Sequence, residues 1–394
     1  MPLLTPAARL RAAYYLLFTM VGVFHAEVLS RSQPWALVDP AMVILVWPVY
    51  GVHYLVLGDL LLRRRADSLV PLFLAGCLLG MYEFVITKVY WVPPWNPASG
   101  AEVGFAWFEV LWVGFAWHAF MSFLIPFVLM QRVFLPGSPD PRRSRQLRWV
   151  LVGAPAFAAA FGTAFGAPAD ELLKSIGVSL AMIAAASFVF SRKALAWGYA
   201  RPEDLVLGRL GRRAAVAALV AVYVLYGLTL QTDAVPSGLA LLAPVPLYAM
   251  LIAMLYPHLK RGGAGVGAAP RAVLKVAFEA PGGGPATPES APLPATAGGG
   301  ELQPPTPVAA PLPPPSPWAA ARSFLTRYGA AFALAIVAAQ LIAIVAAPVL
   351  YAMVFVMIFG GTLTAVLLLG WSARAGWRVW RAQRGGDRAV SSPG

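Results

Sequence analysis

Apolar runs of roughly 18 residues or more recur along this chain, and basic residues gather in every second gap between them. A helix rising about 1.5 Å per residue crosses the ~30 Å hydrocarbon core of a bilayer in such a run. Each backbone N–H and C=O must find a partner within its segment there. The alternating ten-residue pattern of a membrane barrel is absent. The chain is therefore predicted to be an all-α, polytopic helical bundle in a membrane.

The apolar runs predict about ten transmembrane helices. The last two are separated only by a tight turn at Pro348, and a pair of runs with no charge between them could instead be one broken helix. In chain order the predicted spans cover residues 12–30, 37–62, 69–91, 103–134, 150–166, 172–190, 214–230, 238–256, 328–347 and 349–371.

The placement of the basic residues predicts the orientation of the chain. Of the 30 Lys and Arg residues, all but Arg31, Lys88 and Lys174 fall on one predicted side of the membrane. Short loops rich in Lys and Arg face the cytoplasm, so we expect both termini there, in a multi-pass protein of the inner or plasma membrane. The same bias accounts for the net charge of +13. Because the bases form no continuous stripe, nucleic acid is excluded as a partner.

The composition divides the chain into four predicted parts. Residues 1–135 form a four-helix membrane module, 136–260 a four-helix scaffold module, 261–320 a linker, and 321–394 a two-helix hairpin with a tail rich in Trp and Arg. The linker is rich in Pro, Gly and Ala, so we expect disorder; it could be a plain tether or could present PxxP to a cytoplasmic protein. The tail and the basic loops suit contact with anionic lipids.

Ionisable residues gather in the first four predicted spans, while the later spans hold almost none away from their ends. A charge at the bilayer centre costs ~2.5–3.5 kcal/mol on insertion scales, so such side chains usually face the protein interior and have a function. The first module is therefore the predicted functional region. Its intramembrane ionisable residues are His25, Glu27, His53, Asp59, Glu83, Lys88, Glu109 and His118.

The acidic residues suggest a polar pathway in the outer half of this module. Glu27, Glu83 and Glu109 could meet there with Lys88 nearby. On an α-helix Glu83 shares a face with two hydroxyl side chains, those of Thr87 and Tyr90. Simpler interpretations are that Glu27 and Lys88 reach the interface, and that the other acids fix helix packing.

Three histidines are candidate metal or haem ligands: His25, His53 and His118. Hydrogen-bonded packing residues are the simpler interpretation. On an α-helix Glu109 and His118 lie nearly half a turn out of phase, and His25 and Glu27 lie on nearly opposite sides. No motif identifies a cofactor.

No Walker A loop, HExxH, Gly-x-Ser-x-Gly or CxxCH motif is present, so whether the chain is an enzyme stays open. Three functions remain. Transport of protons, cations or a small molecule through the first four helices ranks first, because acids outnumber bases on the outer side. A membrane-embedded enzyme or redox protein that uses a metal or haem is the second. A scaffold or assembly factor that recruits a partner through the Pro-rich linker is the third.

Overall fold

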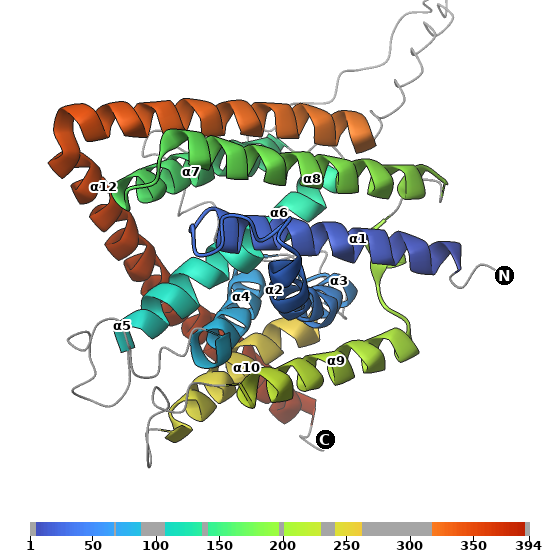
Figure 1. Cartoon of the computed structure of the whole chain (residues 1–394). Helices are drawn as coiled ribbons and strands as arrows, with labels where there is room; N and C mark the ends of the chain where they lie inside the picture. Colours follow the sequence, from blue (N-terminus) through green and yellow to red (C-terminus); the bar gives the residue numbers. More distant parts are fainter. Residues whose placement is uncertain are drawn as a thin grey trace, which may run out of the picture. The chain divides into compact units, whose positions relative to one another are not determined.

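A computed structural model describes residues 5–66, 68–87, 107–135, 141–196, 201–229, 241–261 and 317–390. These residues form helices, with no β-strand among them, which confirms the predicted all-α class (Figure 1). All of them belong to one compact unit, Met1–Ala264 with Pro315–Gly394.

Each of the four N-terminal spans combines α-helix with π-helix, in which hydrogen bonds run from residue i to i+5. The sections are α1 Pro6–Val23 and η1 Phe24–Val28; α2 Pro40–His53, η2 Tyr54–Gly58 and α3 Asp59–Arg64; α4 Leu69–Tyr82 and η3 Glu83–Thr87; and α5 Trp107–Glu109, η5 Val110–Leu124, α6 Ile125–Leu129 and η6 Met130–Phe134.

The later described helices carry no π-helical section. They are α7 Pro141–Ala164, α8 Ala169–Ala196, the 3₁₀ turn η7 Pro202–Leu205, α9 Arg209–Gly227, α10 Pro244–Arg261 and α12 Pro317–Val390. α12 bends at Ala346, whose φ of −151° and ψ of 59° are not helical, two residues before the predicted turn at Pro348. In Figure 1 its orange first arm runs along α7 and α8, and its red-brown second arm turns away.

Seven helical stretches among the described residues are long and apolar enough to cross a membrane. The predicted count of ten differs for three reasons. The last two predicted spans are joined in α12, the apolar part of α7 (Val150–Ala164) is shorter than the others, and α10 is not among the seven. The seven stretches are Pro6–Val28, Pro40–Arg64, Leu69–Ile86, Trp107–Phe134, Ala169–Ala196, Arg209–Gly227 and Trp318–Arg378.

The bounds of the predicted linker need correction. Arg261 ends α10 and Pro317 begins α12, so both ends of the predicted segment 261–320 are helical. Residues 262–316 lie outside the described residues, and their disorder stays a prediction.

Local sequence explains where the first helices begin. Thr5 precedes Pro6, and its hydroxyl accepts a hydrogen bond from the backbone N–H of Ala8 at 3.2 Å. Asp39 precedes Pro40 and accepts from the N–H of Ala41 at 2.8 Å. Both pairs place a capping side chain before a proline, whose missing N–H costs nothing in the first turn of a helix.

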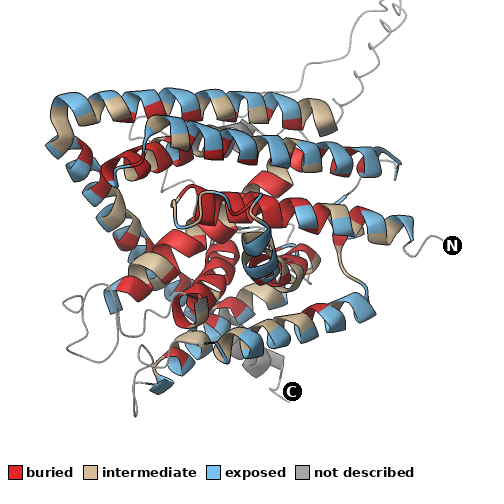
Figure 2. Ribbon diagram, in the orientation of Figure 1, coloured by how far each residue is buried: buried red, intermediate tan, exposed pale blue. Residues whose placement is uncertain are grey.

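Burial separates the inner helices from the outer ones. In the span Leu69–Ile86, 83% of the most apolar window is buried, against 11% in Arg209–Gly227. Figure 2 shows the same contrast, with α4 largely red and α9 largely blue. The exposed apolar side of α9 is the surface that a bilayer would cover.

α4 and η5 approach each other through glycines. A Cβ atom on Gly80 would overlap the backbone carbonyl of Gly114, and one on Gly76 would crowd the backbone of Ala119. Gly76-x-x-x-Gly80 is thus a small-residue packing motif. Gly162-x-x-x-Gly166 has the same spacing but is not a second such contact, because Gly166 has a φ of +77° and nothing near its Cβ position. Gly166 instead serves the turn after α7.

Contacts at the ends of the helices agree with the predicted sidedness. At the predicted inner end, the Arg11 guanidinium donates to the Asp204 carbonyl at 2.9 Å, and Arg65 pairs with Glu203 at 3.0 Å. At the predicted outer end, Arg31 pairs with Glu171 at 3.2 Å. Loops assigned to the same side therefore meet.

Candidate functional site

The π-helical sections coincide with the intramembrane ionisable residues. His25 and Glu27 lie in η1, Glu83 opens η3, His118 lies in η5, and His53 directly precedes η2. Short π-helical insertions in α-helices occur frequently at functional sites, because the wider turn leaves backbone groups and side chains in unusual positions. This coincidence favours the first module as the functional region.

Glu27 lies inside the bundle, with 2% of its surface exposed. Its Oε1 accepts a hydrogen bond from the Tyr50 hydroxyl at 2.6 Å, and its Oε2 accepts from the Ser32 hydroxyl. The Glu27 side chain therefore does not extend into solvent. Both carboxyl oxygens are held by hydroxyl donors, an arrangement that compensates for removal from water.

Glu83 is also buried, and it lies within electrostatic range of the hydroxyls of Tyr50 and Tyr54. Glu27 lies within electrostatic range of the same two hydroxyls. Acids of the first and third spans therefore both lie near tyrosines of the second span.

His118 enters the same region from the fourth span. Its Nδ1 lies 2.7 Å from the Ser122 hydroxyl, and the Tyr54 hydroxyl donates to the Ser122 carbonyl. The Tyr54 ring stacks on Phe18 at 4.0 Å, and its hydroxyl crosses Gly22 so closely that a Cβ there would overlap it. We call the six residues of this region the polar core: Glu27, Tyr50, Tyr54, Glu83, His118 and Ser122.

His53 belongs to a second group, the histidine–tyrosine cluster, made of His53, Tyr82, Tyr223 and Tyr248. The His53 ring lies 4.7 Å from the Tyr82 ring and 5.9 Å from the Tyr223 ring. The Tyr223 and Tyr248 hydroxyls are 3.3 Å apart. α9 and α10, which belong to the predicted scaffold module, contribute half of this cluster.

Glu109 is buried, and its Oε2 has no hydrogen-bond partner among the described residues. The predicted mismatch between Glu109 and His118 assumed α-helical geometry. Since η5 is π-helical, with more residues per turn, nine residues come close to two full turns, and that argument fails.

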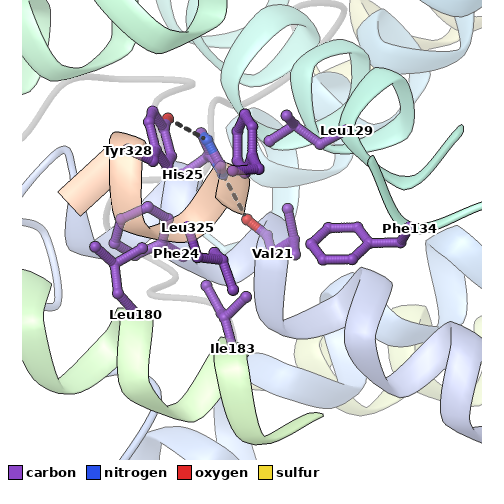
Figure 3. A pocket seen from close by; sticks show the side chains of 10 residues that line it. Val21, Phe24, His25, Leu129, Phe134, Leu180, Ile183, Leu325 and Tyr328 are labelled. Carbon is purple, nitrogen blue, oxygen red and sulfur yellow. Dashed lines mark hydrogen bonds between the residues drawn. The ribbon is translucent and has the colours of Figure 1, made fainter. Parts of the chain in front are cut away.

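His25 points away from Glu27, as predicted. Its Nδ1 lies 2.7 Å from the Val21 carbonyl, and its Nε2 lies 2.9 Å from the Tyr328 hydroxyl of α12. Figure 3 shows both bonds beside a pocket of about 10 Å³, which is at the limit for one water molecule. His25 therefore joins η1 to α12.

The remaining predicted site residues lie outside what the structure describes. Lys88 and Tyr90 follow the last described residue of η3, and Thr87 ends that helix with a side chain that is not described. Within the described ranges, no group of three or more His, Cys, Asp or Glu side chains could hold a metal ion.

The tyrosines of both groups were missed as site residues in the sequence analysis. Tyr50 and Tyr54 lie four residues apart, on one face of the second span, and this spacing was a usable signal. Tyr223 and Tyr248 gave none, because their helices lie far along the chain from His53.

Comparisons with known proteins add a family but no activity. A model of an uncharacterized membrane protein family matches residues 16–281, a range that contains the polar core and the histidine–tyrosine cluster and ends before α12. An uncharacterized protein of Archaeoglobus fulgidus is 37% identical over 125 residues, or 32% of this chain. The chain spans 40% of the length of that curated relative. No solved structure matches this chain.

Proposed function

The chain belongs to an uncharacterized family of membrane proteins, and from that premise we propose that it conducts protons through its first four helices. The observation that carries the proposal is the hydrogen bond of 2.6 Å from Tyr50 to Glu27 inside the membrane module, with Glu83 acting on the same tyrosine. Groups of this kind can take up and pass on a proton, whereas a packing core needs none of them.

Further hydrogen-bonded polar groups lie nearer both ends of the module. On the predicted outer side, Ser32 bonds Glu27. Toward the inner side, Gln131 donates to the Tyr14 hydroxyl at 3.0 Å, and Asp59 accepts from the N–H of Leu207 at 2.6 Å. Protons need a file of such groups and single waters, not a wide cavity, so this arrangement favours protons over larger solutes.

The test is proton flux into liposomes that contain the purified chain, driven by a potassium diffusion potential and followed with a trapped pH dye. We expect flux above protein-free vesicles. We expect Glu27→Gln, Glu83→Gln and Glu109→Gln each to lower it at least tenfold, because an amide cannot bind and release the proton.

Glu171→Gln is the matched control, since the Glu171 side chain is 38% exposed in the first turn of α8. This variant should conduct protons like the unmodified chain. Flux equal to that of empty vesicles, or full flux in all three buried variants, would refute the proposal.

Lipid contacts at the predicted cytoplasmic face are a second part of the proposal. Arg209, Arg212 and Arg213 line an open depression at the start of α9. The Arg381 guanidinium lies 5.0 Å from the centre of the Trp377 ring near the end of α12. Such groups suit anionic headgroups of a plasma membrane.

A cytoplasmic protein that binds the Pro-rich linker is also proposed, and deletion of residues 262–316 would test it by loss of co-purified partners.

A further inference from the structure

The histidine–tyrosine cluster contains two buried polar atoms that the fold leaves unused. His53 Nε2 and the Tyr82 hydroxyl have no hydrogen-bond partner among the described residues. The side chains are 2% and 0% exposed. Buried polar atoms are rarely left in this state unless something else bonds them.

The hydrogen bond at Nδ1 of His53 determines whether Nε2 is a donor or an acceptor. Its Nδ1 lies 2.7 Å from the Val49 carbonyl. A carbonyl oxygen only accepts, so Nδ1 carries the proton, and in a neutral imidazole Nε2 is then an acceptor. Tyr82 offers the complementary O–H donor. A hydroxyl group can donate one bond and accept another, so it has the chemistry that these two atoms lack.

The surroundings favour a flat aromatic molecule as the carrier of that hydroxyl. The Tyr82 ring lies 4.5 Å from Tyr223 and 4.7 Å from His53, spacings at which aromatic rings attract one another. The Tyr223 and Tyr248 hydroxyls form a further polar pair beside them.

Access is from the side of the bundle. Tyr223 and Tyr248 are partly exposed, and Val220 and Val224, which flank Tyr223 on α9, are each 56% exposed. His53 lies 13 residues from the start of α2 and Tyr82 13 residues from the start of α4, so both are about 20 Å from opposite helix ends at helical rise. With the predicted spans in a bilayer, the site would lie at mid-membrane depth, on a surface that lipid would cover.

We propose that His53 and Tyr82 bind the ring hydroxyl of a lipid-soluble phenol or hydroquinone that enters from the bilayer between α9 and α10. The hydroxyl donates to His53 Nε2 and accepts from the Tyr82 hydroxyl, while its ring packs against Tyr223. This site does not depend on proton conduction by the polar core, and either could exist without the other.

The test uses the full chain in lipid nanodiscs and the photoreactive phenol 4-hydroxybenzophenone, with labelled peptides identified by mass spectrometry. We expect labelling on α4 or α9 that excess tetramethylhydroquinone suppresses. The methyl ether, 4-methoxybenzophenone, cannot donate to His53 Nε2 and should label at least tenfold less.

Two variants connect the labelling to the named atoms. Tyr82→Phe and His53→Phe should each lower it about tenfold in protein that still elutes as a single species, and Tyr256→Phe, an exposed tyrosine of α10, should not. Equal labelling by phenol and methyl ether, or unchanged labelling in both variants, would overturn the proposal. So would a stoichiometric metal or haem in the purified protein, because that would give Nε2 a different ligand.

Discussion

At the scale of single residues, two hydroxyl donors compensate for the burial of Glu27. The Tyr50 hydroxyl donates a hydrogen bond to one carboxyl oxygen of Glu27, and the Ser32 hydroxyl donates to the other. A buried carboxyl oxygen that loses its donor carries the full cost of removal from water.

Tyr50→Phe removes one hydroxyl and leaves the ring. We expect a loss of about 1–3 kcal/mol in the free energy of unfolding, because one oxygen of Glu27 loses its donor. Thermal unfolding of purified protein in detergent measures it. Tyr351→Phe, at a tyrosine that is 59% exposed on α12, should unfold like the unmodified chain; equal stability of both variants would show that the bond contributes nothing.

At the scale of elements, the contact of α4 with η5 depends on the absence of side chains. Gly80 and Gly114 bring the two backbones together, and bulk at Gly80 must push them apart. Because Glu83 and His118 follow on these same helices, the spacing of the pair also sets the geometry of the polar core.

Gly80→Ala should destabilise the protein by about 1–3 kcal/mol, the usual cost of inserting atoms into a packed core. Gly177→Ala is the matched control, since nothing lies within 4 Å of its Cβ position in α8. There the change should be neutral or stabilising by up to about 1 kcal/mol, because alanine favours helix. Chemical denaturation in mixed micelles compares the two, and equal losses would contradict the role of Gly80.

The sequence contains enough information for the helices but not for their π-helical sections. Apolar runs and capping pairs such as Thr5-Pro6 predict where helices lie. Hydrophobic periodicity is too coarse to reveal a change from i+4 to i+5 hydrogen bonding, and this change invalidated the predicted mismatch of Glu109 and His118. Partners such as Tyr223 and Tyr328 come from distant helices, so no local pattern could associate them with His53 or His25.

At the scale of the whole molecule, the distribution of charge predicts the orientation in the membrane. The ion pair of Arg65 with Glu203 and that of Arg31 with Glu171 join loops at opposite predicted ends. The described loops are therefore consistent with one predicted orientation in the membrane. One accessibility measurement at each end of the bundle tests that orientation.

Single cysteines provide that measurement in a Cys77→Ala background, which removes the buried native thiol. Asp170→Cys should react with an impermeant maleimide in intact cells, because the Asp170 side chain is 68% exposed at the predicted outer end. Glu203→Cys, at a side chain that is 57% exposed, should react only after lysis. The reverse pattern would invert the topology.

The bend in α12 gives this helix two arms that contact different parts of the chain. Its first arm bonds Ala167 through Gln340 at 3.1 Å, and its second arm places Phe359 5.7 Å from Phe108. The region matched by the family model ends before it. Two separately expressed fragments, 1–264 and 315–394, should thus recognise each other in a shared bilayer and reconstitute the complete molecule.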